Sequence, residues 1–286
     1  MISTAVAWAI VVLAFYSIAD LFGKKAVLRF GYKRAAAVVS AISIIPFLLL
    51  ISIYGIQPIT YYSAALAIVG GIFYGIGFLL LYKSLVTEQT TNTFALSEIF
   101  KAWLVILGAF ILGEILSLKA GQDAGILLIF LGSFMVILTE KLRVNTKMLY
   151  AMLGFICWAV LWTLMAYSIS NSGTYLPEGL LAAFFAALTA FAAAIAFPER
   201  RAAKKAAKEK HWRKYVAAVG ISIGAGSLIF GYLILSKQLA QGASIIAFTP
   251  IVVAIASHKI YLDRLTLVQA AGIVIAVVGA LLLAFY

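Results

Sequence analysis

The segments "EILSLKAGQDAGILLIFLGSFMVIL" (residues 114–138) and "DRLTLVQAAGIVIAVVGALLLAF" (residues 263–285) decide the fold of this chain. In both, an acidic residue precedes a short leucine-bearing connection, and an apolar helix with two glycines seven residues apart follows. Upstream, "GFLLLYKSL" from Gly77 matches "GYLILSKQL" from Gly231. Self-similarity of this kind predicts that the chain consists of two related halves.

The chain is too apolar for a soluble protein. Of its 286 residues, 65% are hydrophobic and 11% are charged, and the mean hydropathy is +1.09. Soluble domains are roughly 45–50% apolar and roughly 25% charged, so we predict an integral membrane protein. One cysteine and two distant histidines predict neither a disulfide nor a metal cluster. We expect no cofactor, and the sequence has no glycine-rich phosphate loop for ATP.

Ten apolar runs have the length of a membrane-spanning helix, which is about 20 residues. They cover residues 4–22, 35–54, 62–82, 91–112, 122–139, 148–169, 179–197, 214–236, 243–260 and 267–285. The runs are too long for barrel strands, and helices satisfy their own backbone hydrogen bonds in lipid. The predicted fold is an all-α integral membrane bundle of ten transmembrane helices. Residues 1–144 form its first five-helix repeat and residues 145–286 its second.

The basic residues predict the orientation of the bundle. Of 22 Lys and Arg residues, 19 fall on one side of the predicted membrane, and only Lys119 and Lys237 belong to the other. The positive-inside rule makes the basic side cytoplasmic, so both termini should be extracytoplasmic in a multi-pass plasma membrane protein. The basic run at residues 199–214 predicts a solvated loop near anionic lipid headgroups, with a lipid-sensing helix as the alternative. Nucleic acid is not expected as a partner.

The number of helices in each half predicts how the halves are related. Five is odd, so the second repeat must enter the membrane inverted relative to the first. Inverted repeats that meet near the midplane are common in secondary transporters, which alternate access to a central site. A duplication with a purely structural role is the alternative.

This pattern resembles the drug/metabolite transporter superfamily, in its EamA-type branch of ten helices. The resemblance rests on the inverted halves, the repeated acid-then-glycine ending, "LGE" at residues 112–114 and "FTP" at residues 248–250, and it covers essentially the whole chain. It implies a small-molecule transporter, since similar proteins move amino acids, nucleotide sugars, phosphorylated metabolites, vitamins or drugs. Some relatives are described with cytoplasmic termini, from which the charge bias here departs. A homodimer is one alternative for the oligomeric state.

Two opposite charges stand inside the fourth predicted helix. Glu98 and Lys101 are three residues apart, so they share one helix face. Each costs roughly 2.5–3.5 kcal/mol near a helix centre, so we expect either a mutual ion pair or a pair facing a wet cavity. In the second case Glu98 receives an ammonium group or a coupling proton, and Lys101 a carboxylate or phosphate. Three more residues of this helix complete the predicted substrate site: Asn92, Phe94 and Ser97.

Residues of other helices are predicted to line the same cavity. Tyr74 and Phe78 stand one turn apart in the third predicted helix, and Trp158 and Trp162 do so in the sixth. Aromatic residues also gather at membrane interfaces, which is the alternative for them. In the ninth helix, Thr249 offers a hydroxyl to a substrate.

Four residues are predicted to couple or gate transport: Glu98, Asp20, His258 and Pro250. Pro250 frees a backbone carbonyl and kinks its helix, as Pro46 does in the second helix. An ion pair with Lys24 is the alternative for Asp20. The glycines that crowd the third and eighth helices are expected at helix contacts more than at substrate.

The predicted function is a secondary transporter that moves a small polar or zwitterionic, amino-acid-like metabolite by alternating access, as an exporter or facilitator. The alternative is a proton-coupled exporter of cationic or lipophilic drugs, with Glu98 as the proton site. An enzyme is not expected, because scattered Ser and Thr with two distant histidines supply no nucleophile beside a base.

Overall fold

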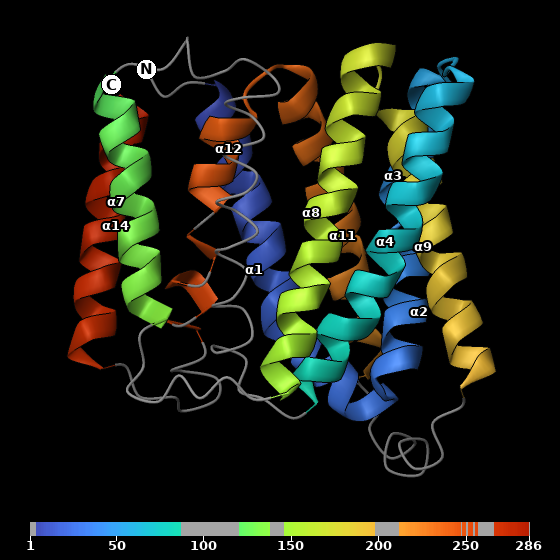
Figure 1. Cartoon of the computed structure of the whole chain (residues 1–286), viewed down its shortest axis with the longest axis horizontal. Helices are drawn as coiled ribbons and strands as arrows, with labels where there is room; N and C mark the ends of the chain where they lie inside the picture. The colour runs from blue at the N-terminus through green and yellow to red at the C-terminus, as the bar shows by residue number, and fades with distance from the viewer. Residues whose placement is uncertain are drawn as a thin grey trace.

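The computed structural model describes residues 4–86, 120–137, 146–197, 212–246, 248–249, 251–253, 255–256 and 266–285. Within these ranges the regular structure is entirely helical, and the helices run side by side as a bundle (Figure 1).

Five helices come from the N-terminal part of the chain: α1 (Thr4–Phe30), α2 (Tyr32–Ile42), α3 (Ile45–Tyr54), α4 (Tyr61–Leu85) and α7 (Ala120–Ile137). Five come from the C-terminal part: α8 (Thr146–Ser172), α9 (Leu176–Ala196), α11 (Trp212–Leu235), α12 (Leu239–Ile246) and α14 (Leu267–Phe285). Thr60 caps the start of α4, where its side chain accepts a hydrogen bond from the Ser63 N–H at 3.1 Å. The start of α1 and the end of α14 lie at the same end of the bundle (Figure 1).

Six segments of the described chain are long and apolar enough to cross a membrane. They are Val6–Leu28, Tyr32–Tyr54, Tyr61–Leu85, Leu149–Ser172, Leu176–Ala196 and Arg213–Leu235. Shorter apolar stretches lie in α7 and α14. The protein therefore crosses the membrane several times. The count of ten stays a prediction, since the predicted span 91–112 lies outside the described residues and 243–260 is described only in part.

The first helix ends later than predicted. α1 continues to Phe30 instead of ending at residue 22, so Lys24 and Lys25 lie on the helix and not in a loop. Only Gly31, with φ +81°, separates α1 from α2. Long basic side chains can keep their aliphatic parts on apolar surface while the charge reaches water, and positive charge is favourable near a helix C-terminus. The basic residues therefore do not stop the helix.

The second predicted span bends near its centre, as Pro46 predicts. α2 ends at Ile42, α3 begins at Ile45, and Pro46 lies in the first turn of α3. Because proline has no N–H, the helical hydrogen-bond ladder is interrupted there. The bend brings the Ser43 carbonyl so close to Gly224 of α11 that any side chain on Gly224 would collide with it.

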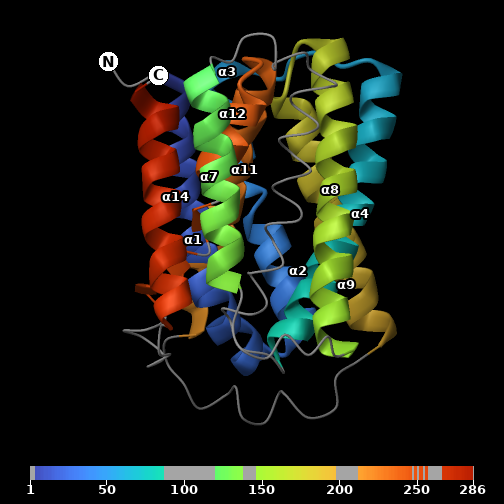
Figure 2. The same cartoon turned by 60° about the vertical axis from the view of Figure 1, so that its left-hand side comes forward.

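The repeated glycines of the two opening segments meet each other in the structure. Gly132 of α7 faces Gly272 of α14, and Gly279 of α14 faces Gly125 of α7. A Cβ on Gly132 would strike the Gly272 carbonyl, and a Cβ on Gly279 would strike the Gly125 carbonyl. The first glycine of each segment thus meets the second glycine of the other, so the two helices are antiparallel. This is the arrangement that an inverted repeat requires. The α7–α14 pair forms one edge of the bundle (Figure 2).

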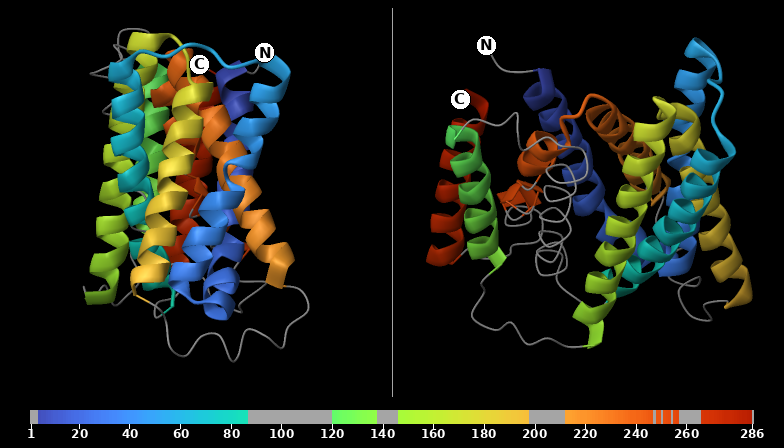
Figure 3. Two further views of the ribbon diagram at one scale, coloured as in Figure 1. Left: turned by 90° about the vertical axis from the view of Figure 1, so that its right-hand side faces the viewer. Right: turned by 45° about the horizontal axis from the view of Figure 1, so that its top comes forward.

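The other large helix contacts also join a helix of the N-terminal part to a helix of the C-terminal part. α4 packs mainly on α8, and α1 packs mainly on α11. α4 and α11 carry the matching segments at Gly77 and Gly231, and α1 and α8 are the first helices of the two predicted repeats. Figure 3 shows the α7–α14 pair at the opposite side of the bundle from α3 and α9. The boundary at residues 144 and 145 itself stays a prediction.

Candidate functional site

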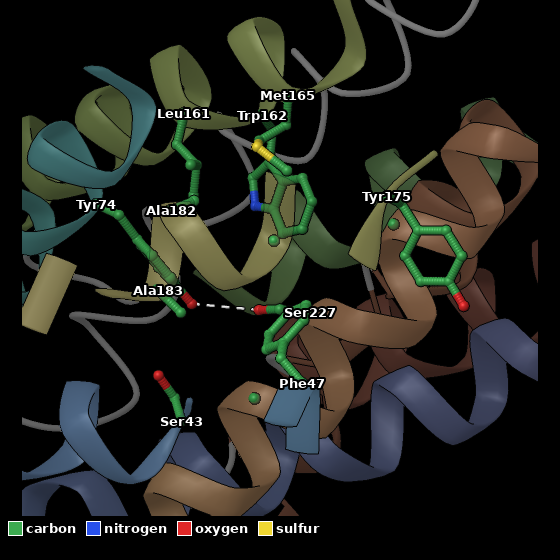
Figure 4. A pocket seen from close by; sticks show the side chains of 13 residues that line it. Ser43, Phe47, Tyr74, Leu161, Trp162, Met165, Tyr175, Ala182, Ala183 and Ser227 are labelled. Atoms are coloured by element: carbon green, nitrogen blue, oxygen red, sulfur yellow. Dashed lines mark hydrogen bonds between the residues drawn. The ribbon is translucent and has the colours of Figure 1, made fainter. Parts of the chain in front are cut away.

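A pocket lies between helices from both parts of the chain. About 410 Å³ of empty space lies between the side chains, part of it open to the surroundings. Figure 4 shows the side chains converging from α4, α8, α9, α11 and the α2–α3 bend. The residues that line it are Ser43, Phe47, Tyr74, Leu161, Trp162, Met165, Tyr175, Gly179, Ala182, Ala183, Gly224, Ser227 and Gly231.

Two hydroxyl groups from different helices form the polar centre of the pocket. The hydroxyl oxygens of Tyr74 and Ser227 lie 3.3 Å apart, and either can donate the hydrogen bond (Figure 4). Tyr74 is 6% exposed and Ser227 is 8% exposed. Tyr16 of α1 lies close to Ser227, and its ring packs on Gly226. Since buried hydroxyls need partners, these groups tie α1, α4 and α11 together.

The four aromatic residues singled out in the sequence come together beside this centre. Tyr74 and Trp162 lie on the pocket wall. The Phe78 and Tyr74 ring centroids are 4.6 Å apart, and the Trp158 ring stands edge-on to Tyr74 at 5.6 Å and to Phe78 at 5.3 Å. Phe78 and Trp158 thus support the wall from behind. Substrate contact stays a prediction for all four.

Small residues give the pocket its shape. Gly179 lies against the Phe47 ring, and Gly231 lies against Tyr175. Gly71 of α4 approaches the backbone of Ala182 on α9 so closely that a Cβ there would strike a carbonyl. The expectation that glycines serve helix packing is confirmed at Gly71. Gly224 and Gly231 both pack and line the pocket.

The predicted charged site falls in a part of the chain that the structure does not describe. Glu98, Lys101, Asn92, Phe94 and Ser97 lie outside the described residues, as do His258 and Pro250. Among the described residues that line the pocket, none is charged.

Two other predicted residues lie within the described part. Thr249 is 1% exposed, and its hydroxyl donates to the Ile246 carbonyl at 2.6 Å, so its hydrogen is used within its own segment. Asp20 lies on α1 and interacts electrostatically with Tyr16 and Tyr82. A substrate contact for Thr249 and gating by Asp20 stay predictions.

Sequence reasoning missed the acid nearest in sequence to the pocket wall. The seventh span was predicted to begin at residue 179, which left Glu178 in a loop. The structure begins α9 at Leu176, with Pro177 in its first turn, and encloses Glu178 completely. Proline at the start of a helix followed by an acid is a recognisable N-terminal signal. That signal, applied to "YLPEG" at residues 175–179, would have found it.

A multi-pass helical bundle with inverted packing and a pocket near its centre defines a class of membrane transport proteins. A family model described as the EamA-like transporter family matches residues 3–138 and again residues 145–285. The chain belongs to the EamA-like transporter family, a family of transporters and not of enzymes. Two matches that together span the chain fit a two-repeat architecture.

Comparison with solved structures supports the fold. Twenty-nine chains match. One of them, described as "Crystal structure of protein", has a TM-score of 0.72 and 16% sequence identity, and the match covers 99% of this chain and 96% of that chain. At this sequence identity the match supports the fold and not the function. A search of curated protein sequences finds no match.

Proposed function

We propose that this protein is a secondary transporter that moves a small polar or zwitterionic, amino-acid-like metabolite across the plasma membrane, as an exporter or facilitator. The observation that carries the proposal is the pocket between the two parts of the chain, where Tyr74 from the middle of α4 and Ser227 from the middle of α11 share a hydrogen bond. A site between two inverted halves can be exposed to each side in turn when one half rocks against the other.

The pocket walls suit a solute with both polar and apolar parts. Tyr74 and Ser227 offer hydrogen bonds, while Trp162 and Phe47 offer flat apolar surface. For the charged ends of a zwitterion we propose Glu98 and Lys101, on the sequence argument that such charges in a span need a wet environment or a ligand.

The narrowness of the pocket is consistent with alternating access. Residues that line it are almost fully buried, with Tyr74 6% and Trp162 5% exposed. A metabolite therefore needs the helices to separate. The close glycine contacts between α4 and α9 provide a smooth surface on which they can move.

The aromatic walls also support a second candidate, a proton-coupled exporter of cationic or lipophilic drugs. Trp162, Tyr74 and Tyr175 present aromatic rings to the pocket, and such rings attract cations and bind apolar groups. The two candidates differ in what drives transport, because only the second needs a pH gradient.

The test is reconstitution in proteoliposomes. A thermal-shift screen of amino acids, phosphorylated metabolites and quaternary amines first selects a solute that stabilises the protein, and its flux is then measured with and without a pH gradient. We expect flux of an amino-acid-like solute that falls when Ser227→Phe fills the pocket. Unchanged flux in Ser227→Phe would place transport elsewhere. Wild-type flux in both Glu98→Gln and Lys101→Met would remove the charged pair from the site.

A further inference from the structure

A single carboxylate is enclosed at the beginning of α9. Glu178 is 0% exposed and lies in the first turn of the helix. Its Oε1 accepts hydrogen bonds from the Ser172 hydroxyl at 2.5 Å and from the Thr174 hydroxyl at 2.7 Å. Its Oε2 is one of the few buried side-chain oxygens in the described part of the chain that have no hydrogen-bond partner.

The two oxygens of this carboxylate are therefore in different situations. The start of a helix favours negative charge, and two hydroxyls stabilise Oε1, but hydroxyls bring no positive charge. Buried acceptors almost always have a partner, and a bare anionic oxygen is the most costly exception. A group that carries positive charge and donates a hydrogen bond to Oε2 completes the site.

A structural brace explains only half of the arrangement. The bonds from Ser172 and Thr174 fix the connection between α8 and α9 through Oε1. A glutamine would accept both bonds through its amide oxygen, and it would place no charge in an apolar interior. The bare Oε2 is what the brace leaves unexplained.

Glu178 stands beside the pocket along the chain and along the helix. Gly179 follows it directly, Tyr175 precedes it by three residues, and both line the pocket. Ala182 also lines the pocket and lies one turn further on the same face of α9 as Glu178. The Phe47 ring lies against Gly179, next to the acid.

We propose that Oε2 of Glu178 holds a protonated amine of the transported solute, with the rings of Tyr175 and Phe47 beside the cation. Aromatic rings attract cations in desolvated surroundings, and the described residues that line the pocket supply no charge that would compete with Glu178. The proposal rests on the proposed function and narrows it to solutes that carry an ammonium group.

Binding measurements on the purified full-length protein test this directly. The probes are 2-phenylethylamine, which is a cation at neutral pH, and 2-phenylethanol, its neutral counterpart of nearly equal shape. We expect wild type to bind the amine more tightly than the alcohol. Glu178→Gln should lower the affinity for the amine by about tenfold or more, the effect of losing a hydrogen bond to a charged group, and leave the affinity for the alcohol unchanged.

Two further variants separate the ligand role from the brace. Ser172→Ala removes one bond of the brace and keeps the charge, so it should retain the preference for the amine. Asp123→Asn removes an exposed acid from α7 and should change neither affinity. Equal losses in Ser172→Ala and Glu178→Gln would show a structural role and overturn the proposal, as would loss of the preference in Glu98→Gln with Glu178→Gln unaffected.

The wild-type result alone keeps the proposal open to refutation if Glu178→Gln does not fold. Equal affinity of wild type for amine and alcohol overturns it without any variant. The proposed function fails separately: if the amine binds in a Glu178-dependent way and no solute crosses the membrane of proteoliposomes, the cation site stands and transport does not.

Discussion

The α7–α14 and α4–α8 pairs both depend on glycine, yet they produce opposite surfaces. In α7–α14, Gly132 and Gly279 place backbone against backbone, so the two helices close on each other. In α4–α8, Gly77 meets the Gly154 carbonyl and also the ring of Trp158, and Gly70 faces Leu161. Where glycine meets only backbone and small side chains, the contact is a seam with no space for a ligand. Glycine against a large side chain fixes that side chain in place, and here it supports the wall of a pocket.

The comparison shows that close packing in lipid has two uses. Without water to drive association, helices in a membrane rely on close van der Waals contact. The α7–α14 pair uses such contact for attachment at the edge of the bundle (Figure 2). The α4–α8 pair uses it to hold Trp158, which in turn supports Tyr74 on the pocket wall.

Breaking the seam should have the largest effect. Gly132→Leu places a side chain against the Gly272 carbonyl and the Ala276 backbone, where no flexible group can give way. We expect a loss of about 3 kcal/mol or more in the free energy of unfolding, measured by thermal unfolding in detergent. Leu127→Val on the same helix is the control, since Leu127 is 70% exposed. A Tm of Gly132→Leu equal to that of the control would contradict the close seam.

A smaller substitution in the α4–α8 pair, Gly77→Ala, should lower the free energy of unfolding by less. In Gly77→Ala the added methyl meets the Trp158 ring, which can turn, and the Gly154 carbonyl, which is part of the backbone. We expect a loss of about 1–3 kcal/mol. Because Trp158 supports Tyr74, solute binding should weaken as well, whereas any Gly132 variant that folds should bind normally. Equal binding in both glycine variants would break the distinction between seam and wall.

The pocket wall itself can be separated from its support. Trp162→Ala removes a side chain that lines the pocket and packs on Phe230 with ring centroids 4.5 Å apart. We expect solute affinity to fall about tenfold, the equivalent of about 1.4 kcal/mol. Phe78→Leu, behind the wall, should change affinity much less while it lowers the Tm. Measured by titration of the purified protein, the reverse order would mean that Phe78 contacts the solute and Trp162 does not.

Much of the fold could be predicted because composition and spacing carry it. The excess of apolar residues predicts a membrane protein, the paired glycines of α7 and α14 predict a repeat, and Pro46 predicts the bend between α2 and α3. Each of these is a local property of the chain. The length of α1 was wrong because basic side chains near a helix end were taken as a loop, although they are compatible with a helix.

The site was harder to predict for a physical reason. In a soluble helix, alternation of polar and apolar residues shows which face is buried. Here both the lipid-facing and the inward faces are apolar, so the sequence gives little sign of which hydroxyls converge. Ser43, Tyr175 and Ser227 are ordinary residues in the sequence and become a site only when the α2–α3 bend, the start of α9 and α11 are assembled. Tyr74 and Trp162 were found because aromatic spacing survives in an apolar background.

The hydrogen bond between Tyr74 and Ser227 should give the smallest effect and the finest test of the pocket centre. Tyr74→Phe and Ser227→Ala each remove one hydroxyl of a 3.3 Å pair, and each should cost about 1 kcal/mol in the free energy of unfolding. Since both changes remove the same bond, the double variant should cost less than the sum of the two, by about 0.5 kcal/mol or more. Tyr16 also lies beside Ser227 and provides a second test. The free-energy costs of Tyr16→Phe and Ser227→Ala should likewise add to less than their sum in the double variant. If the double variant of each pair costs the full sum of its two single variants, the three hydroxyls do not form one centre. The pocket wall would then be apolar throughout, like the α7–α14 contact.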